Sequence, residues 1–286
     1  MIILEIILAA LAATSLCLLG LRALGGREPV YKLGAVEPVF FVALKYRGAP
    51  GSGEKLAPGV EVRWTVDADF VFVGAGEAYW NRFMILAGGA AEAMPLSLPD
   101  NVEDAYVARL ALGKPPRLAL GTIRFLTAAG IWRKPGGDVS ADLGHRKFRA
   151  EVMPSVETIR TLLEKPPSYR PAMVNFLKYY PTARYAEPRP GTTAVSGRAA
   201  YGRYGIVALQ TVYRTGGHLV FYGRIDAVLQ DARSGPTLGP WDDIAVMQYA
   251  EAKGILTMEN VPKYVAALRH RDASLDRSII IASSAR

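Results

Sequence analysis

The two halves of this 286-residue chain carry similar motifs in the same order, and this internal repeat constrains the fold more than any other feature. The matched pairs are VFFVALKYR and MVNFLKYY (39–47 and 173–180), VFVG and VFYG (71–74 and 220–223), Trp80 and Trp241, and NVEDAYVARL and NVPKYVAALR (101–110 and 260–269). Ordered self-similarity over most of a unit indicates a tandem duplication. We therefore expect two related units in one chain.

The second half shows its elements most clearly. An apolar run at 173–180 predicts a strand, and Ser196 caps a helical pattern that ends at Gly216 and Gly217. Strands are expected at 218–230 and 241–249, a helix at 250–271 broken near Pro262, and a last strand at 277–282. This βαββαβ order is the ferredoxin-like arrangement, which leaves one sheet face bare.

The predicted fold class is α+β, with two tandem ferredoxin-like βαββαβ repeats packed as an intramolecular pseudo-dimeric α/β barrel. The first repeat is predicted to be degenerate, because GVEVRWTV at 59–66 stands where the second repeat has its capped helix. In it, Trp80 and its apolar run are expected to lead into a helix, 101–110 corresponds to the second helix, and 118–123 to the last strand. The expected divisions are an anchor (1–27), the degenerate repeat (28–125), a linker with a short helix (126–170) and the complete repeat (171–286).

The N-terminus carries the apolar run IILEIILAALAATSLCLLGL from Ile2 to Leu21, in which Glu5 is the only charge. As a helix this run is about 30 Å long, which is the thickness of a bilayer's hydrocarbon core. A single-pass membrane anchor is therefore predicted, with a cleaved signal peptide as the alternative. Arg22 follows the run and no basic residue precedes it, which predicts an inner-membrane location with the main body in the cytoplasm.

The composition excludes some function classes. The net charge is +8, but the basic residues are scattered and accompany no recognition motif, so no nucleic-acid partner is expected. Cys17 is the single cysteine, and His145, His218 and His270 form no metal-binding spacing. No metal and no cofactor are predicted. The lipid bilayer, subunits of a membrane complex and a small apolar ligand are the expected partners.

Five motifs of the second half resemble a known group of proteins: MVNFLKY, SGRAAYGRYG, GGHLVFYGRI, WDDIAVMQY and YVAALRHRDASLDRSIII. Over about residues 156–284 the chain resembles an uncharacterised bacterial family of the dimeric α/β-barrel superfamily. Relatives in that superfamily include the antibiotic-biosynthesis monooxygenases and the EthD and NIPSNAP proteins. The resemblance implies two ferredoxin-like units that form a barrel, and it implies no settled activity.

Some side chains of the second half are candidates for a site. His270 and Lys178 are candidate catalytic residues, although His270 and Arg271 near a helix C-terminus also complement the helix dipole. A pocket for a small planar ligand is predicted from aromatic and polar residues that converge between sheet and helices, and ordinary core packing is the alternative. These pocket residues are Asn175, Tyr201, Tyr204, Tyr222, Arg224 and Trp241.

Two functions remain open from the sequence. The first is a membrane-anchored, non-catalytic accessory protein that is a subunit or docking partner of a larger membrane complex. The second is a cofactor-independent enzyme of the monooxygenase or isomerase kind, acting on a small aromatic or lipophilic substrate. A closed core beneath Tyr201 and Trp241 favours the first, whereas a pocket with His270 or Lys178 facing inward favours the second.

Overall fold

A computed structural model describes residues 2–48, 53–139, 148–186 and 194–285. The helices are α1 (Ile2–Gly25), α2 (Pro29–Leu33), α3 (Arg117–Ala128), α4 (Val156–Leu163), α5 (Gly197–Arg214), α6 (Gly254–Thr257) and α7 (Pro262–Ser274), with short 3-10 turns at Ala150–Val152 and Met258–Asn260. The strands are β1 (Val39–Tyr46), β2 (Lys55–Leu56), β3 (Val60–Val73), β4 (Arg82–Gly88), β5 (Leu96–Ser97), β6 (Val102–Leu112), β7 (Ala172–Tyr179), β8 (His218–Gln230), β9 (Asp243–Gln248) and β10 (Leu275–Ser284).

Eight strands close into one antiparallel barrel in the order β1-β4-β3-β10-β7-β9-β8-β6. The first half supplies the run β6-β1-β4-β3 and the second half the run β10-β7-β9-β8, so each half places its own four strands in the same relative order. The halves join where β3 pairs with β10 and where β6 pairs with β8. Closing the barrel leaves the sheet with no unpaired edge.

The barrel interior is filled by large apolar side chains. Successive residues of a strand point to opposite faces, so Val174 and Phe176 of β7 face inward while Met173 faces the helices. Aromatic rings dominate this interior, and Phe41 lies edge-on to Phe176 with 5.5 Å between ring centroids. The interior is therefore a packed apolar core.

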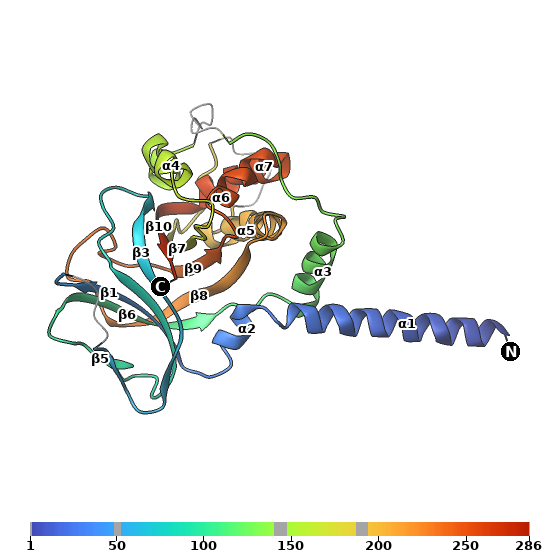
Figure 1. Ribbon diagram of the computed structural model, residues 1–286, viewed down its shortest axis with the longest axis horizontal. Coiled ribbons are helices and arrows are strands. Elements are labelled where there is room, and N and C mark those ends of the chain that lie inside the picture. The colour runs from blue at the N-terminus through green and yellow to red at the C-terminus, as the bar shows by residue number, and fades with distance from the viewer. Residues whose placement is uncertain (1, 49–52, 140–147, 187–193, 286) are drawn as a thin grey trace.

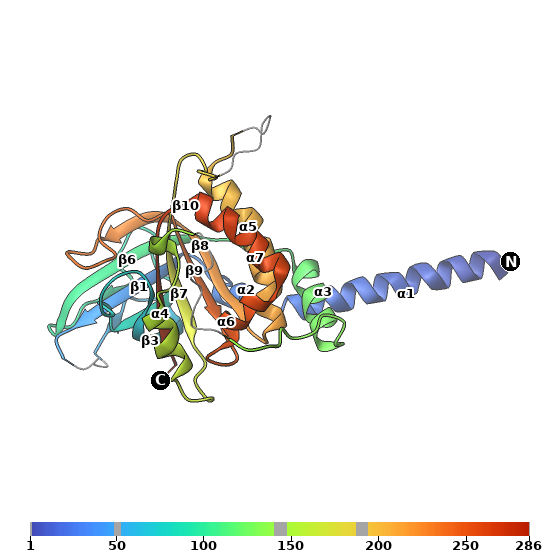
Figure 2. The same cartoon turned by 90° about the horizontal axis from the view of Figure 1, so that it is seen from above.

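The outer faces of the two halves are covered differently. Helices α5, α6 and α7 lie over the second half of the sheet, as Figures 1 and 2 show, and α4 lies against β3, where the Thr158 hydroxyl donates to the Phe72 carbonyl at 2.9 Å. Among the described residues, the outer apolar cluster of the first half is covered by β5, which pairs with β2, and by loop residues such as Met94. The described residues contain no helix between β1 and β6. A helix–sheet interface, and the site within it, therefore belongs to the second half.

The predicted fold class is corrected. The described chain is a mixed α/β structure built on one large antiparallel sheet, and it has no membrane-spanning helix. Residues 101–110, matched in sequence to a helix, form most of β6, which pairs on both sides with β1 and β8. Residues 118–123, matched to a strand, lie in α3. The expected helix after the Trp80 run is absent, because Gly88 and Gly89 turn the chain with φ angles of 97° and 79°.

The predicted membrane anchor is also wrong. Within the described residues no helix is long and apolar enough to cross a bilayer. Leu21 and Gly25 at the end of α1 pack against α3, where Gly121 touches the Leu21 carbonyl closely, so this end of the apolar run belongs to a helix–helix contact. Ile2, Glu5 and Arg22 lie on α1, which extends away from the barrel in Figure 1. The inner-membrane location and the bilayer contact, both of which rested on this helix, lose their basis.

Candidate functional site

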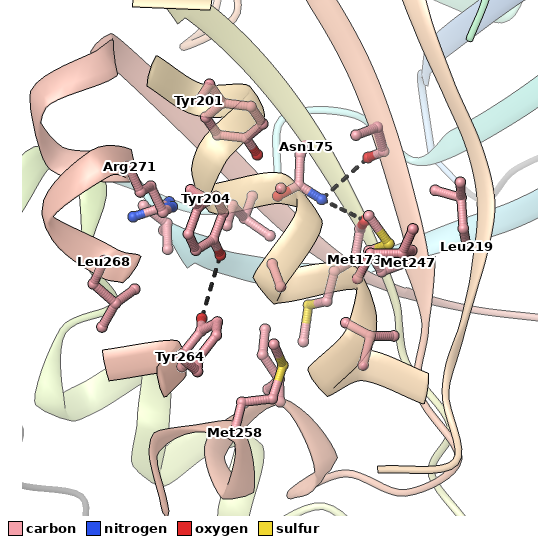
Figure 3. A pocket seen from close by; sticks show the side chains of 18 of the residues that line it. Met173, Asn175, Tyr201, Tyr204, Leu219, Met247, Met258, Tyr264, Leu268 and Arg271 are labelled. Atoms are coloured by element: carbon pink, nitrogen blue, oxygen red, sulfur yellow. Dashed lines mark hydrogen bonds between the residues drawn. The ribbon is translucent and has the colours of Figure 1, made fainter. Parts of the chain in front are cut away.

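A cavity of about 350 Å³ lies between the outer face of the second-half sheet and the helices that cover it. Its floor comes from β7, β8, β9 and β10, and its walls come from α5, α6 and α7 (Figure 3). Ligand pockets in proteins span roughly 300–1,000 Å³, so this cavity suits a small molecule. It is the candidate functional site of the chain.

The lining of the cavity is mostly apolar and adaptable. Four of the seven methionines line it, namely Met153, Met173, Met247 and Met258. Methionine is unbranched and polarizable, so it adjusts to irregular ligands and contacts aromatic rings favourably. Tyr201, Tyr204 and Tyr264 add aromatic surface, and the rings of Tyr201 and Tyr204 lie 5.4 Å apart. Such a lining favours a flat, apolar ligand body.

Two glycines of α5 leave room at the cavity wall. Gly202 and Gly205 both line the cavity, and a Cβ atom added at either position would meet no atom within 4 Å. A glycine in a helix interior costs about 1 kcal/mol relative to alanine. The helix therefore keeps two unfavourable residues at positions where they leave the cavity open.

A few polar groups reach the cavity among this apolar surface. Asn175 of β7 donates its side-chain N–H groups to the carbonyls of Met173 at 2.7 Å and Ala245 at 3.1 Å, which leaves its side-chain oxygen as an acceptor. The hydroxyls of Tyr204 and Tyr264 lie 3.3 Å apart. The Tyr201 hydroxyl has no hydrogen-bond partner among the described residues and points into the cavity in Figure 3.

A buried carboxylate stands beside one end of the cavity. Asp243, at the start of β9, is 0% exposed and accepts from Arg198 of α5 at 2.5 and 2.7 Å. The hydroxyl of Tyr179 donates to it at 2.8 Å, and the hydroxyl of Tyr222 donates to the same oxygen. Four hydrogen bonds thus hold this charge, and a carboxylate so fully occupied is a poor general base.

Burial keeps the phenols around the cavity neutral. It is the main cause that raises the pKa of Tyr201, Tyr249 and Tyr264 above the ordinary value, and nearby Arg271 opposes this only in part. Burial, with the Asp243 charge as the next cause, raises the pKa of Tyr222 to about 12. These hydroxyls are therefore hydrogen-bond donors and acceptors at neutral pH rather than anions.

The structure brings four of the six predicted pocket residues together. Asn175, Tyr201, Tyr204 and Tyr222 all line the cavity. Trp241 instead lies in the barrel core, where its Nε1 donates to the Thr237 carbonyl at 2.6 Å. Arg224 is exposed on β8, beyond the part of that strand that the helices cover.

Neither predicted catalytic residue lines the cavity. Lys178 forms an ion pair with Asp242 at 3.0 Å. The Nδ1 atom of His270 lies 2.7 Å from the Tyr185 hydroxyl, and neither of these residues lines the cavity. Both side chains therefore contact partners that lie outside the cavity lining.

Sequence reasoning did not assign cavity roles to Arg198, Asp243 and Arg271. Asp243 carried a signal, because an acidic residue at the head of the apolar strand Asp243–Gln248 is expected to have a partner. Arg271 was interpreted only as a dipole partner, although it recurs one helical turn after the buried Leu268. Arg198 has no local signal, since its partner lies 45 residues away.

Metal ligands do not gather in the described part of the chain, where no group of three His, Cys, Asp or Glu side chains is placed to hold a metal ion. His145 lies outside the described residues. His218 is half-buried at the start of β8, and burial is the main cause that lowers its pKa. Neither position adds a group to the cavity.

No protein-family model matches the chain, and the comparison with curated proteins finds no match. Two crystal structures of the protein RPA0582 are similar at 24% identity, one of the methylated protein and one described as a protein of unknown function from Rhodopseudomonas palustris. Their TM-scores are 0.40 and 0.38, and they cover 47% and 46% of this chain and 95% and 94% of their own chains. Similarity at this level transfers no property to the chain.

Proposed function

We propose that this protein is a non-catalytic accessory module that binds a small, mainly apolar molecule in the cavity between α5, α7 and the sheet. The observation that carries the proposal is the cavity itself, about 350 Å³ in volume and lined mostly by methionine, tyrosine and aliphatic side chains. A few placed polar groups in such a lining are typical of small-molecule sites. The glycines of α5 support it further, because they keep one wall open.

The described residues bring no reactive set to the cavity lining, which supports binding over catalysis. Asp243 is fully paired, and His270 and Lys178 do not line the cavity. A bound molecule would therefore be held rather than converted. In this proposal the bound molecule stabilises the layer formed by α5 and α7, which pack against each other over the sheet.

A fluorescence titration with N-phenyl-1-naphthylamine, an uncharged aromatic probe, tests the proposal. Gly205→Phe places a ring at the cavity wall, where the wild-type residue leaves open space. Arg203→Phe puts the same ring on the exposed side of the same helix and is the matched control. We expect saturable binding to the wild type and the control, and at least about ten-fold weaker binding to Gly205→Phe, because the ring occupies the ligand's place.

Equal binding to both variants would place the probe outside the cavity and contradict the proposal. Circular dichroism is the control that checks whether each variant keeps its helix content. Exposed apolar side chains of α1, such as Leu16 and Leu19, contribute the same background in all three proteins, so the difference between the two variants reports on the cavity alone.

A cofactor-independent enzyme acting on a small aromatic or lipophilic substrate is the second candidate. It is favoured by the Tyr201 hydroxyl, which faces the cavity without a hydrogen-bond partner among the described residues and is therefore available as a proton donor. Mass spectrometry of a bound ligand after long incubation separates the two functions. An unchanged ligand supports binding, and a product that is lost in Tyr201→Phe supports the enzyme.

A further inference from the structure

Arg271 of α7 is a buried cation at the cavity wall. The residue is only 6% exposed, and its Nη1 atom donates to the Val152 carbonyl and lies 3.8 Å from the sulfur of Met153. Its other guanidinium nitrogens have no hydrogen bond to a described residue and are not sealed inside protein. Since Arg271 lines the cavity, these N–H groups are available to a bound molecule (Figure 3).

Arg271 also has no ionic partner among the described residues. No ion pair between described residues involves Arg271. Glu259, the carboxylate among the described lining residues, lies beyond ion-pairing distance from it. The comparison with Arg82 shows what is missing. Arg82 is as deeply buried, at 5% exposed, and is held by Glu54 at 2.9 Å and by Asp67 at 3.0 Å.

A buried charge without a counter-charge is costly, so buried cations are normally paired. The other cation on the cavity lining, Arg198, is already paired with Asp243. The tyrosines next to Arg271 do not supply the missing charge, because burial keeps Tyr201, Tyr249 and Tyr264 protonated. Arg271 is therefore a buried cation on the cavity lining that no described carboxylate contacts directly.

We propose that the ligand of this cavity is an aromatic or other compact apolar carboxylate, whose carboxylate group binds Arg271. This inference rests on the proposed ligand binding and names its chemical class. A planar guanidinium matches a carboxylate in two hydrogen bonds, and a single guanidinium balances a single negative charge. Tyr201, whose hydroxyl faces the same cavity and has no hydrogen-bond partner among the described residues, is the second donor to the carboxylate. The apolar body lies against the methionines Met173, Met247 and Met258.

The test compares two probes of the same size and shape, one a carboxylate and the other its uncharged amide. Isothermal titration calorimetry at pH 7 measures binding of 2-naphthoate and of the uncharged 2-naphthamide to the full chain. The wild type is expected to bind naphthoate at least about ten-fold more tightly, since a hydrogen bond to a charged partner contributes roughly 1.5–3 kcal/mol. Arg271→Met is expected to abolish that preference and to keep the affinity for naphthamide.

Arg269→Met is the matched control, because Arg269 is exposed on the same helix and does not line the cavity. Arg271→Lys keeps the charge but not the planar fork, and is expected to retain part of the preference. It also provides a folded variant if Arg271→Met loses the Val152 contact and unfolds. A rise in the dissociation constant of naphthoate with salt, absent for naphthamide, gives a further readout on the wild type.

The outcomes separate the two proposals. If both probes bind with equal affinity and Arg271→Met changes neither, the carboxylate assignment is wrong and the binding function stands. If neither those probes nor N-phenyl-1-naphthylamine binds, the binding function itself fails. A preference for naphthoate that persists in Arg271→Met would place the carboxylate elsewhere, and would also overturn the inference.

Discussion

Replacing Asp243 by leucine is expected to destabilise the protein by roughly 3–5 kcal/mol, because it leaves the hydroxyls of Tyr179 and Tyr222 without their shared acceptor. The Asp243 side chain is 0% exposed and is the common acceptor for Arg198, Tyr179 and Tyr222. Leucine is similar in size and accepts no hydrogen bond. The substitution therefore strands three donors at once.

The magnitude follows from what each donor then loses. The hydroxyls of Tyr179 and Tyr222 remain without their acceptor, and a buried unsatisfied group costs about 1–3 kcal/mol. The Arg198 side chain is 42% exposed and can turn to water, so its lost ion pair contributes little. The two phenols together account for most of the expected loss.

Urea unfolding of Asp243→Leu, monitored by circular dichroism, measures this free energy. Asp242→Leu is the matched control. The Asp242 side chain is 27% exposed, and its ion pair with Lys178 and its hydrogen bond from the Tyr179 backbone N–H at 2.8 Å are together expected to contribute about 2 kcal/mol. The triple variant with Tyr179→Phe and Tyr222→Phe removes the stranded hydroxyls and should recover most of the loss. A single variant no less stable than the control, or a triple variant with no recovery, would refute the reasoning.

Three further predictions concern other parts of the molecule. Burial is the main cause that lowers the pKa of His218 below its unfolded value of about 6.5, while Glu28 opposes this shift and Arg124 adds to it. The unfolded state therefore binds the proton more readily, so the free energy of unfolding falls as the pH drops through that value. His218→Gln should flatten this part of the urea-midpoint profile between about pH 7 and 5, and an unchanged profile would contradict it. Gly205→Ala should raise the free energy of unfolding by about 0.5–1 kcal/mol, since its Cβ meets no atom within 4 Å; a loss of stability would show that the space is not open. Gly121→Ala should speed hydrogen exchange at residues 21–26, because its Cβ meets the Leu21 carbonyl, and unchanged protection would contradict the α1–α3 contact.

Much of the second half could be predicted because its signals are local. The Ser196 side chain accepts from the Ala199 N–H at 3.2 Å, and Gly216 adopts a φ of 84° just after α5 ends. Caps and glycine turns act over a few residues, so they can be read without the rest of the chain. Asn175, Tyr201, Tyr204 and Tyr222 followed from the same strand and helix periods, which placed them on facing surfaces.

Local patterns were insufficient where one residue pattern is compatible with two structures. NVEDAYVARL and NVPKYVAALR are similar, yet the first lies in β6 and the second in α7. Pro262 begins α7 at a position where its missing N–H needs no partner. The first segment has no such start signal, and its Val102–Leu112 backbone is instead paired with β1 and β8 on both sides. Strand pairing across the barrel, which no short window contains, decided that element.

The sequence by itself determined the apolar periodicity, the helix caps and the duplicated order of motifs, because each depends on residues near one another in the chain. The tertiary structure decided the closed barrel, the contact of α1 with α3 and the cavity. It also decided the difference between Arg82 and Arg271, two buried arginines of which one is paired and the other is not. Whether a charge has a partner depends on residues brought together from distant positions, and only the folded chain fixes those distances.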